Sequence, residues 1–321
     1  MSIKIERVSR YSIILFLTFL IFLTPWESLK GVSFEDLQNY IDRMAQLSVY
    51  GESYVIDTSS YLINFAKEIG WGYLLLLLTQ VFEDYRAALF CVSLFCCLVI
   101  SSYVLKKTNH TIASVLLVNP IFIDLLLSQQ RSALAFSIFL LSLSYRNHFI
   151  IFLFFVLALS IHLASIILFT FLMIVNFLNN ISFHRREVLK KNVASFVTVF
   201  VLSLSVYILK DIFLGFIGDR RAGDSADSVS IAYSLFWYAS LCCLVLFSFK
   251  TDRDSLLAIF FLGIFAVSSL LGEYSARFLS FTLPFLIIAL PKLNQGLREF
   301  WLIVFLLYAL IQWVYWLRLF F

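Results

Sequence analysis

The sequence is poor in charge, because Asp, Glu, Lys and Arg together make up only 14% of its 321 residues. Soluble domains carry about 25% charged residues, so this composition does not suit a protein surrounded by water. Hydrophobic residues fill the deficit: they account for 61% of the chain and include 36 phenylalanines. A soluble core cannot enclose so much apolar surface, and the sequence therefore indicates a polytopic integral membrane protein.

The apolar runs lack the alternation of polar and apolar residues that is typical of membrane β-strands. Many of them are also longer than the roughly 9–11 residues of a barrel strand. Helices are the other way to satisfy backbone hydrogen bonds inside a bilayer. We therefore predict an all-α protein that forms a single membrane domain over residues 1–321.

Several functional signatures are also missing. The cysteines lie inside apolar runs without the spacing of a zinc site, and we interpret them as packing residues: Cys91, Cys96, Cys97, Cys242 and Cys243. The four histidines are scattered over both sides of the predicted membrane, so neither a metal nor a cofactor is expected. No internal repeat of the kind found in many transporters is visible. The first apolar run ends in "LTPWES" without a small-x-small cleavage site, which favours an uncleaved span over a signal peptide.

Apolar runs that end at charged residues predict about eleven spans. Some are shorter than the roughly 20 residues expected, which suggests tilted, re-entrant or shielded helices. Segment 71–82, "WGYLLLLLTQVF", is too short to count and is interpreted as a half-helix or interfacial piece. The predicted spans are 11–25, 87–105, 111–127, 132–145, 148–161, 163–178, 193–209, 231–249, 255–271, 278–290 and 300–317.

The distribution of Lys and Arg sets the orientation. With the N-terminus inside, basic clusters such as "KK" at 106–107 and "HRREVLKK" at 184–191 lie on the inner side, as the positive-inside rule predicts. Two outer loops result. Loop 26–86 contains the amphipathic stretches "FEDLQNYIDRMAQL" and "SYLINFAKEIG", and loop 210–230 is rich in Gly, Asp and Ser and expected to be mobile.

Ionisable groups near the outer ends of spans are candidate functional residues, because charge is costly in lipid. Arg131 lies in "LSQQRSALAF", between two predicted spans. The spacing of Asp124, Ser128 and Arg131 would place them on one face of a continuing helix. Asp124 is then most simply the partner that neutralises an arginine. His162, in "LSIHLASI", lies at the outer end of another span.

The remaining candidates fall on the same side. They are Arg86, the pair Arg220 and Arg221 in the second loop, and Glu273, Tyr274 and Arg277 in "GEYSARF". Taken singly, each has a plainer interpretation: an arginine at a helix end extends to the headgroups, a lone histidine packs, and loop arginines are solvated. Gathered on one face, the arginines suit an anionic ligand such as a lipid diphosphate, whose oxygens accept bidentate hydrogen bonds from guanidinium groups.

Four stretches resemble bacterial O-antigen and exopolysaccharide polymerases of the Wzy type, particularly the EpsG-like branch. "QRSALA" resembles the family's Arg-Gln-x-x-Ala segment, although Ser132 stands where the family has glutamine. "HLAS" resembles its His-x-Ser-Ala segment with the last two residues reversed. "ARFLSFTLPFLIIALP" at 276–291 resembles its Arg-aromatic segment, and "DLQNYIDRM" at 36–44 its outer-loop Asp-x-x-x-Tyr region.

The resemblance implies a fold like that of the GT-C glycosyltransferases, in the bacterial inner membrane, with the active site facing the periplasm. Such a polymerase transfers a growing glycan from undecaprenyl diphosphate onto an incoming lipid-linked repeat unit. Arg131 and Arg277 would stabilise the leaving diphosphate, and His162 or Glu273 would accept or orient the acceptor proton. The implied substrate-binding residues are Arg86, Gln130, Arg220, Arg221 and Tyr274.

Three other functions stay open at this point: a flippase or transporter of lipid-linked oligosaccharide, an O-antigen ligase and, less favoured, a membrane O-acyltransferase. The expected partners are membrane lipids and the undecaprenyl-diphosphate-linked oligosaccharide, as donor and as acceptor, and no nucleic acid. Chain-length control would need a regulator that this sequence does not reveal.

Overall fold

The computed structural model describes residues 2–55, 68–108, 115–180, 188–217, 231–248, 252–271 and 276–317. Within these residues the chain is helical, with one isolated bridge between Ser248 and Leu293 and no strand. The all-α prediction is therefore confirmed for the described part of the chain. Contacts divide the chain into two compact units: the first comprises Met1–Lys107, Val118–Phe169 and Ile311–Phe321, and the second Thr108–Leu117 and Thr170–Leu310.

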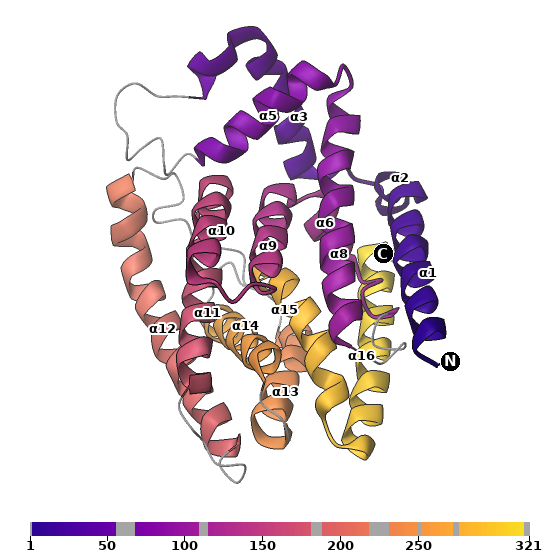
Figure 1. Cartoon of the computed structure of the whole chain (residues 1–321), viewed down its shortest axis with the longest axis vertical. Coiled ribbons are helices and arrows are strands. Elements are labelled where there is room, and N and C mark those ends of the chain that lie inside the picture. The colour runs from indigo at the N-terminus through magenta and orange to yellow at the C-terminus, as the bar shows by residue number, and fades with distance from the viewer. Residues whose placement is uncertain are drawn as a thin grey trace. The chain divides into compact units, whose positions relative to one another are not determined.

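The first unit holds the N-terminal helices (Figure 1). These are α1 (Ser2–Leu23), α2 (Trp26–Lys30), α3 (Glu35–Tyr50), η1 (Gly51–Tyr54), α5 (Ile69–Val81), α6 (Tyr85–Lys107), α8 (Pro120–Leu127), α9 (Gln130–Ser142) and α10 (His148–Ile161). The second unit holds α12 (Val188–Ile217), α13 (Ile231–Phe247), α14 (Arg253–Leu270), α15 (Ala276–Ala289) and η3 (Leu290–Lys292). The chain passes from one unit to the other at Lys107–Thr108, at Leu117–Val118, within α11 (Ser165–Asn180) and within α16 (Gln295–Trp316).

Helices α3 and α5 lie across the ends of α6, α9 and α10 in the first unit (Figure 1). Helix α3 is amphipathic, as the sequence predicts: Leu37, Tyr40, Met44 and Leu47 are buried at helical spacing, while the residues between them are more exposed. The half-helix expected at 71–82 is α5. Most of the other predicted amphipathic stretch, "SYLINFAKEIG", lies outside the described residues.

In the second unit, α14 is buried from Asp254 to Val267 and packs between α12, α13 and α15. An aromatic cluster joins α13 to α16. The Trp237 indole nitrogen donates a hydrogen bond to the Tyr308 hydroxyl at 2.8 Å, and the Phe236 and Tyr308 rings stack at 4.1 Å. Helix α12 continues through Ile217, into the second predicted loop at 210–230. Residues 218–230 lie outside the described part.

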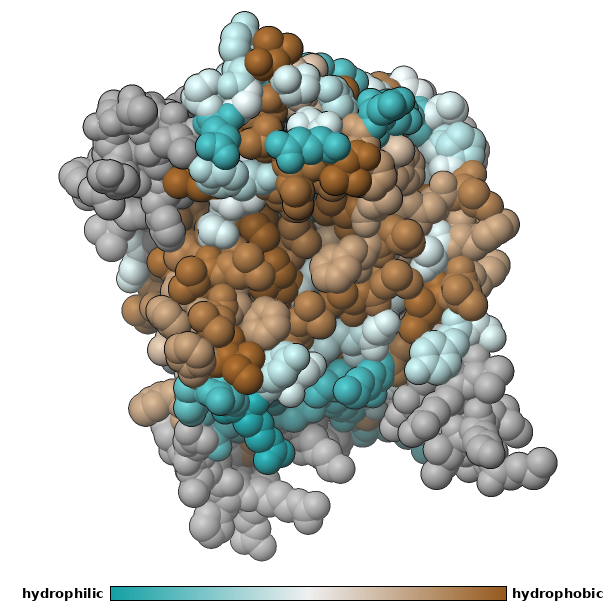
Figure 2. All heavy atoms as spheres, turned by 45° about the horizontal axis from the view of Figure 1, so that its top comes forward, coloured by the Kyte–Doolittle hydropathy of each residue, from teal (hydrophilic) through white to brown (hydrophobic). Residues whose placement is uncertain are grey.

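Four of the described helices are long and apolar enough to cross a membrane, and a fifth span results if α8 and α9 are counted together. The four are Tyr85–Lys107, Val188–Ser205, Arg253–Leu270 and Gln295–Trp316. Several shorter helices are also apolar, including α10, and many large apolar side chains are exposed, some of them on the face drawn in Figure 2. By length and composition, the described residues thus support a polytopic membrane protein with fewer spans than predicted.

The third predicted span, 111–127, is wrong in its helical extent. Helix α8 begins at Pro120, with the Asn119 side chain accepting a hydrogen bond from the Ile121 amide at 2.9 Å, and it has only eight residues. Such a helix is about 12 Å long, well short of the roughly 30 Å hydrocarbon core. After a break at Ser128 and Gln129 the chain continues as α9, bent by 101° from α8. Asp124, Ser128 and Arg131 therefore do not share the face of one continuing helix.

Candidate functional site

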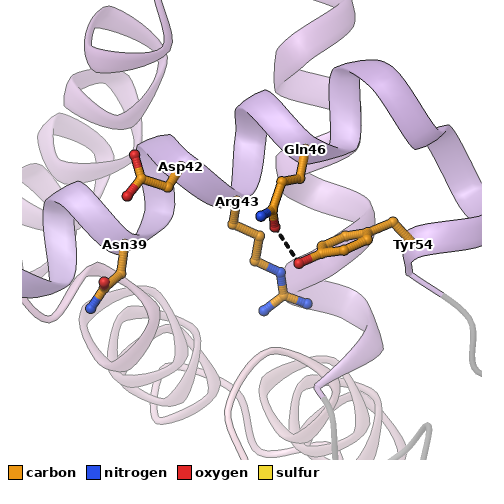
Figure 3. Close-up of a pocket in the computed structure, with 5 residues that line it drawn as sticks. All are labelled: Asn39, Asp42, Arg43, Gln46 and Tyr54. Carbon is orange, nitrogen blue, oxygen red and sulfur yellow. Dashed lines mark hydrogen bonds between the residues drawn. The ribbon is translucent and has the colours of Figure 1, made fainter.

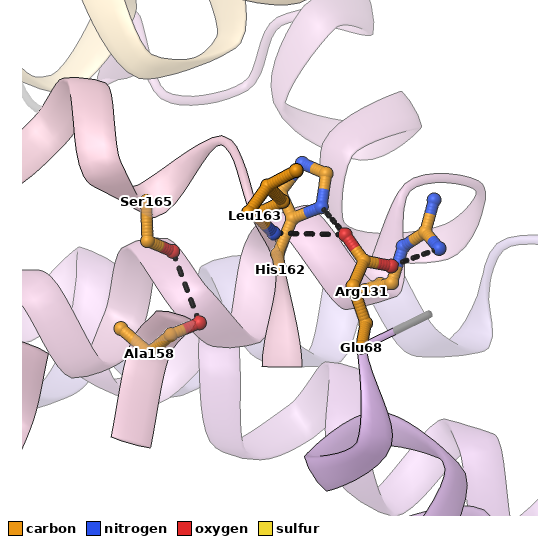
Figure 4. Close-up of polar contacts among 6 residues, drawn as sticks. All are labelled: Glu68, Arg131, Ala158, His162, Leu163 and Ser165. Atoms are coloured by element: carbon orange, nitrogen blue, oxygen red, sulfur yellow. Dashed lines mark hydrogen bonds and ion pairs between the residues drawn. The ribbon is translucent and has the colours of Figure 1, made fainter. Parts of the chain in front are cut away.

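A group of ionisable side chains gathers around the carboxylate of Glu68, the residue that precedes α5 (Figure 4). One oxygen, Oε1, lies 2.7 Å from His162 Nδ1 and accepts a hydrogen bond from the Leu163 amide at 2.8 Å. The other oxygen, Oε2, accepts a hydrogen bond from the Arg131 guanidinium in an ion pair. We call Glu68, Arg131 and His162 the Glu68 group.

The break between α10 and α11 positions His162. Helix α10 ends at Ile161 because His162 adopts an extended backbone conformation, with φ −150° and ψ 118°. The Ser165 hydroxyl, at the start of α11, donates a hydrogen bond at 3.1 Å to the Ala158 carbonyl, which also accepts a hydrogen bond from the His162 amide at 2.9 Å, so this carbonyl ties the start of α11 to the last turn of α10. The break also frees the Leu163 amide from helical hydrogen bonding, and this amide then binds Glu68.

The break between α8 and α9 positions Arg131. Arg131 is in the first turn of α9, and the N-cap residue, Gln129, provides no side-chain hydrogen bond to that turn. The start of α9 therefore contributes partial positive charge beside the guanidinium. The Arg131 side chain is 27% exposed, yet its Nε atom is buried without a hydrogen-bond partner among the described residues.

The surroundings keep Glu68 ionised. Burial acts to raise the pKa of its carboxyl, but the hydrogen bond from His162 and the positive charge of Arg131 outweigh burial, and the pKa lies below its ordinary value. An ionised carboxylate only accepts hydrogen bonds, so His162 Nδ1 must be the donor.

Helix α3 brings Tyr40 and Arg43 towards the same region. Burial, followed by the nearby charge of Arg131, lowers the pKa of the Arg43 guanidinium. A Cβ atom on Gly72 would lie 3.5 Å from one Arg43 nitrogen, so the side chain lies close against α5. Burial raises the pKa of Tyr40 to about 12, and its ring packs edge-on against Trp71 at 5.1 Å. Two arginines, a histidine and one carboxylate thus share one part of the first unit.

Comparison with protein-family models supplies an independent observation: the model of the EpsG family matches residues 10–320, nearly the whole chain. The chain belongs to the EpsG family. This is a family of Wzy-type polysaccharide polymerase-like membrane proteins. Searches of the curated proteins and of the solved structures found no match.

Two of the residues singled out by resemblance to the EpsG-like branch come together in the structure. Arg131 and His162 are joined through Glu68, although their catalytic roles stay predictions. Arg131 pairs with Glu68, and the Asp124 carboxylate accepts a hydrogen bond from Gln129 Nε2 at 2.9 Å, where the chain turns sharply between α8 and α9. That Asp124 neutralises a nearby arginine stays a prediction.

The other predicted residues of this EpsG-family chain are placed differently. Gln130 is buried, and its Nε2 atom donates a hydrogen bond to Ser93 Oγ of α6 at 2.9 Å, so it links α9 to α6. Arg86 forms an exposed ion pair with Glu27 at 3.0 Å. Arg277 is exposed in the first turn of α15, in the second unit. Four further predicted site residues lie outside the described part of the chain: Arg220, Arg221, Glu273 and Tyr274.

The sequence analysis missed Glu68, Tyr40 and Arg43 as site residues. Glu68 is 63 residues from Arg131 and 94 from His162 along the chain, so no local spacing connects them. A signal was nevertheless present, because Glu68 is a carboxylate immediately before an apolar helix, where charge needs a partner. Tyr40 and Arg43 both lie in "DLQNYIDRM", which the resemblance had already marked.

Proposed function

We propose that this EpsG-family protein is a polysaccharide polymerase, for O-antigen or a related glycan, that acts on lipid-diphosphate-linked substrates. It transfers the growing glycan from undecaprenyl diphosphate onto the sugar of an incoming lipid-linked repeat unit. The observation that carries this proposal is the Glu68 group, which joins an arginine to a histidine–carboxylate pair. An arginine can stabilise the negative charge of a departing diphosphate, and a histidine held by a carboxylate can take the proton of the attacking hydroxyl.

Arg131 is the proposed partner of the leaving diphosphate. When the bond between the sugar C1 atom and the diphosphate oxygen breaks, negative charge builds on that oxygen. A fixed guanidinium stabilises this charge more in the transition state than in the ground state. The unpartnered Nε atom of Arg131 and the adjacent start of α9 support this role, since both present positive charge or N–H donors to an anion.

His162 is the proposed general base. Glu68 orients the imidazole through Nδ1, and in the proposed step Nε2 of the neutral imidazole accepts the proton of the acceptor hydroxyl while the hydroxyl oxygen forms the new bond to C1. The hydroxyl oxygen thereby replaces the diphosphate oxygen at C1, and undecaprenyl diphosphate leaves with the electron pair of the broken bond. A carboxylate orients a histidine base in a similar way in the Ser-His-Asp hydrolases.

The proposed location is the bacterial inner membrane, with the Glu68 group facing the periplasm. The excess of Lys and Arg on the opposite side of the predicted spans supports this orientation. The finer architecture proposed is a GT-C-like fold with about eleven spans, some of them too short to cross the membrane as single straight helices. Loop 26–86 would then form the periplasmic cover that carries Glu68, Tyr40 and Arg43.

Extension of a purified lipid-linked repeat unit by the purified protein tests this proposal. Arg131→Ala is expected to lower the polymerisation rate by about a hundredfold or more, the usual cost of removing one donor to a developing oxyanion. Arg298→Ala is the matched control, since Arg298 pairs with the exposed Glu299 at 2.7 Å on α16, and it should keep the wild-type rate.

Normal chain lengths from Arg131→Ala at normal protein levels would contradict the proposed role. A deletion strain separates the rival functions. Loss of a polymerase leaves lipopolysaccharide with a single repeat unit, loss of a ligase leaves none attached, and loss of a flippase accumulates substrate on the inner side. Only the first outcome agrees with the proposal.

A further inference from the structure

An open pocket of about 490 Å³ lies on α3, beside η1 (Figure 3). Its lining is entirely polar or aromatic, and consists of Asn39, Asp42, Arg43, Gln46 and Tyr54. The volume falls within the range of about 300–1,000 Å³ that is typical of small-molecule sites. The function proposed above uses Arg131 and His162 and leaves this pocket without a role.

The pocket is built on one face of a single helix. Asn39, Asp42, Arg43 and Gln46 follow one another at intervals of three, one and three residues, so their side chains emerge on the same side of α3 (Figure 3). The opposite face of α3 holds the buried residues Leu37, Met44 and Leu47, which anchor the helix to the first unit. The polar face is thus held in place by the packing beneath it.

Neighbouring side chains orient two of the lining groups. Gln38 Nε2 donates a hydrogen bond to Asp42 Oδ1 at 2.9 Å, which leaves Oδ2 able to accept from a ligand. The Tyr54 hydroxyl donates a hydrogen bond to Gln46 Oε1 (Figure 3), which leaves the Gln46 amide N–H groups able to donate. Tyr54 is itself stacked on Tyr50, with ring centroids 6.2 Å apart. The pocket therefore presents acceptors and donors in fixed positions.

Arg43 connects the pocket to the Glu68 group. It lines the pocket, and it lies close enough to Arg131 and Glu68 for their charges to act on it. A molecule seated in the pocket would therefore contact a guanidinium on which the charges of Arg131 and Glu68 also act.

We propose that this pocket is a saccharide subsite, which binds a sugar of the lipid-linked repeat unit next to the reacting centre. The inference rests on the proposed function, and it names the part of the substrate that α3 recognises. Carboxamide and carboxylate groups pair with the neighbouring hydroxyls of a sugar ring as donors and acceptors, and a tyrosine ring packs against its apolar face. The Asp42 carboxylate and the Arg43 guanidinium together give the lining no net charge, which suits the neutral hydroxyl groups of a sugar.

The test compares the wild-type protein with the double variant Asn39→Ala/Gln46→Ala. Both side chains are exposed, so the variant should fold, and Ser48→Ala, exposed on the same helix outside the pocket, is the control. The probe is the lipid-free repeat-unit oligosaccharide, released from its diphosphate by mild acid and added to the protein in nanodiscs. Ligand-observed NMR should give binding that is weaker by about tenfold or more in the double variant and unchanged in Ser48→Ala.

Extension kinetics assign the sugar to one of the two substrates. A higher KM for the incoming repeat unit with an unchanged kcat assigns the pocket to the acceptor, and a higher KM for the lipid-linked polymer assigns it to the donor. Equal oligosaccharide binding by wild type and double variant would overturn the inference. Arg131→Ala should still bind the free oligosaccharide, so a failure of the polymerase proposal would leave this result intact and distinguishable.

Discussion

At the scale of single residues, Glu68 holds the candidate site together. Its carboxylate receives three hydrogen bonds, from the Arg131 guanidinium, the His162 imidazole and the Leu163 amide. Removal of one partner from such a buried network leaves the others with unmet hydrogen-bonding groups, which costs more than the lost bond alone. Glu68 therefore has a structural as well as an electrostatic role.

The depressed pKa of Glu68 predicts how stability depends on pH. The folded pKa lies below the ordinary value of 4.5, so this carboxylate stabilises the folded protein above pH 4.5, and the stabilisation is lost as pH falls through the folded pKa. Thermal unfolding of the protein in detergent should therefore show a fall in Tm below about pH 4.5. Glu68→Gln should have a lower Tm at neutral pH and lose this part of the acid dependence.

Glu52→Gln is the matched control for that experiment, because Glu52 is an exposed carboxylate on η1. Its pH profile should follow the wild type. An acid dependence of Glu68→Gln equal to that of the wild type would contradict the assignment of the effect to Glu68.

Sequence patterns could find Arg131 and His162 because each is a costly polar group beside apolar runs. They could not find the partner of Arg131, since that depends on which distant segment packs against α9. Asp124 has the correct helical spacing, but the spacing argument assumes an unbroken helix, and the chain bends by 101° after Ser128. Helical spacing therefore does not predict which side chains lie together at a break between two helices.

At the scale of elements, the site depends on two helix breaks and one close helix contact. The breaks lie before Arg131 and at His162, and the contact joins α5 to α10, where Gly70 faces Ser160. A Cβ atom on Gly70 would lie 2.3 Å from the Ser160 hydroxyl and 2.9 Å from the Ser160 carbonyl oxygen. Only glycine permits this approach, and Gly70 is two residues from Glu68.

Gly70→Ala is therefore expected to push α5 away from α10 and to withdraw Glu68 from His162. A displacement of about 1 Å in a positioning group can cost a hundredfold in rate, so the polymerisation rate should fall by about ten- to a hundredfold. The measurement is the initial rate of repeat-unit extension, together with Tm to confirm that the variant is folded.

Gly296→Ala on α16 is the control for that substitution, because a Cβ atom there would meet nothing within 4 Å. Alanine also has the higher helix propensity, so this variant should be as active and at least as stable as the wild type. A fully active Gly70→Ala would show that the contact between α5 and α10 does not position Glu68.

At the scale of the whole molecule, composition and charge predicted the all-helical membrane class, and the family match over residues 10–320 supports it. The number of spans was less predictable. Apolar runs mark where lipid-like surroundings begin and end, but α8 and α9 show that one run can hold a sharp bend between two short helices. A hydropathy profile shows which residues are apolar, but it does not show where the chain bends within an apolar run.

Orientation of the membrane helices gives a prediction for the whole chain. Alkaline phosphatase, which is active only outside the cytoplasm, should be active when fused after Gly51 and inactive when fused after Lys107. The reason is that α6 is long and apolar enough to cross the membrane between these points and ends in the basic pair Lys106 and Lys107. Activity at both positions would mean that α5 also crosses, and it would reverse the proposed orientation of everything after it.

The sharing of one carboxylate between Arg131 and His162 has a kinetic consequence. In the proposed mechanism, a diphosphate that binds Arg131 draws the guanidinium away from Glu68, and the negative charge of the carboxylate then acts more strongly on His162. We expect the imidazole to accept a proton more readily when the donor lipid is present than when the site is empty. Binding of the donor would thereby prepare the site for the acceptor, and the order of the two substrates would follow from one glutamate without movement of a domain.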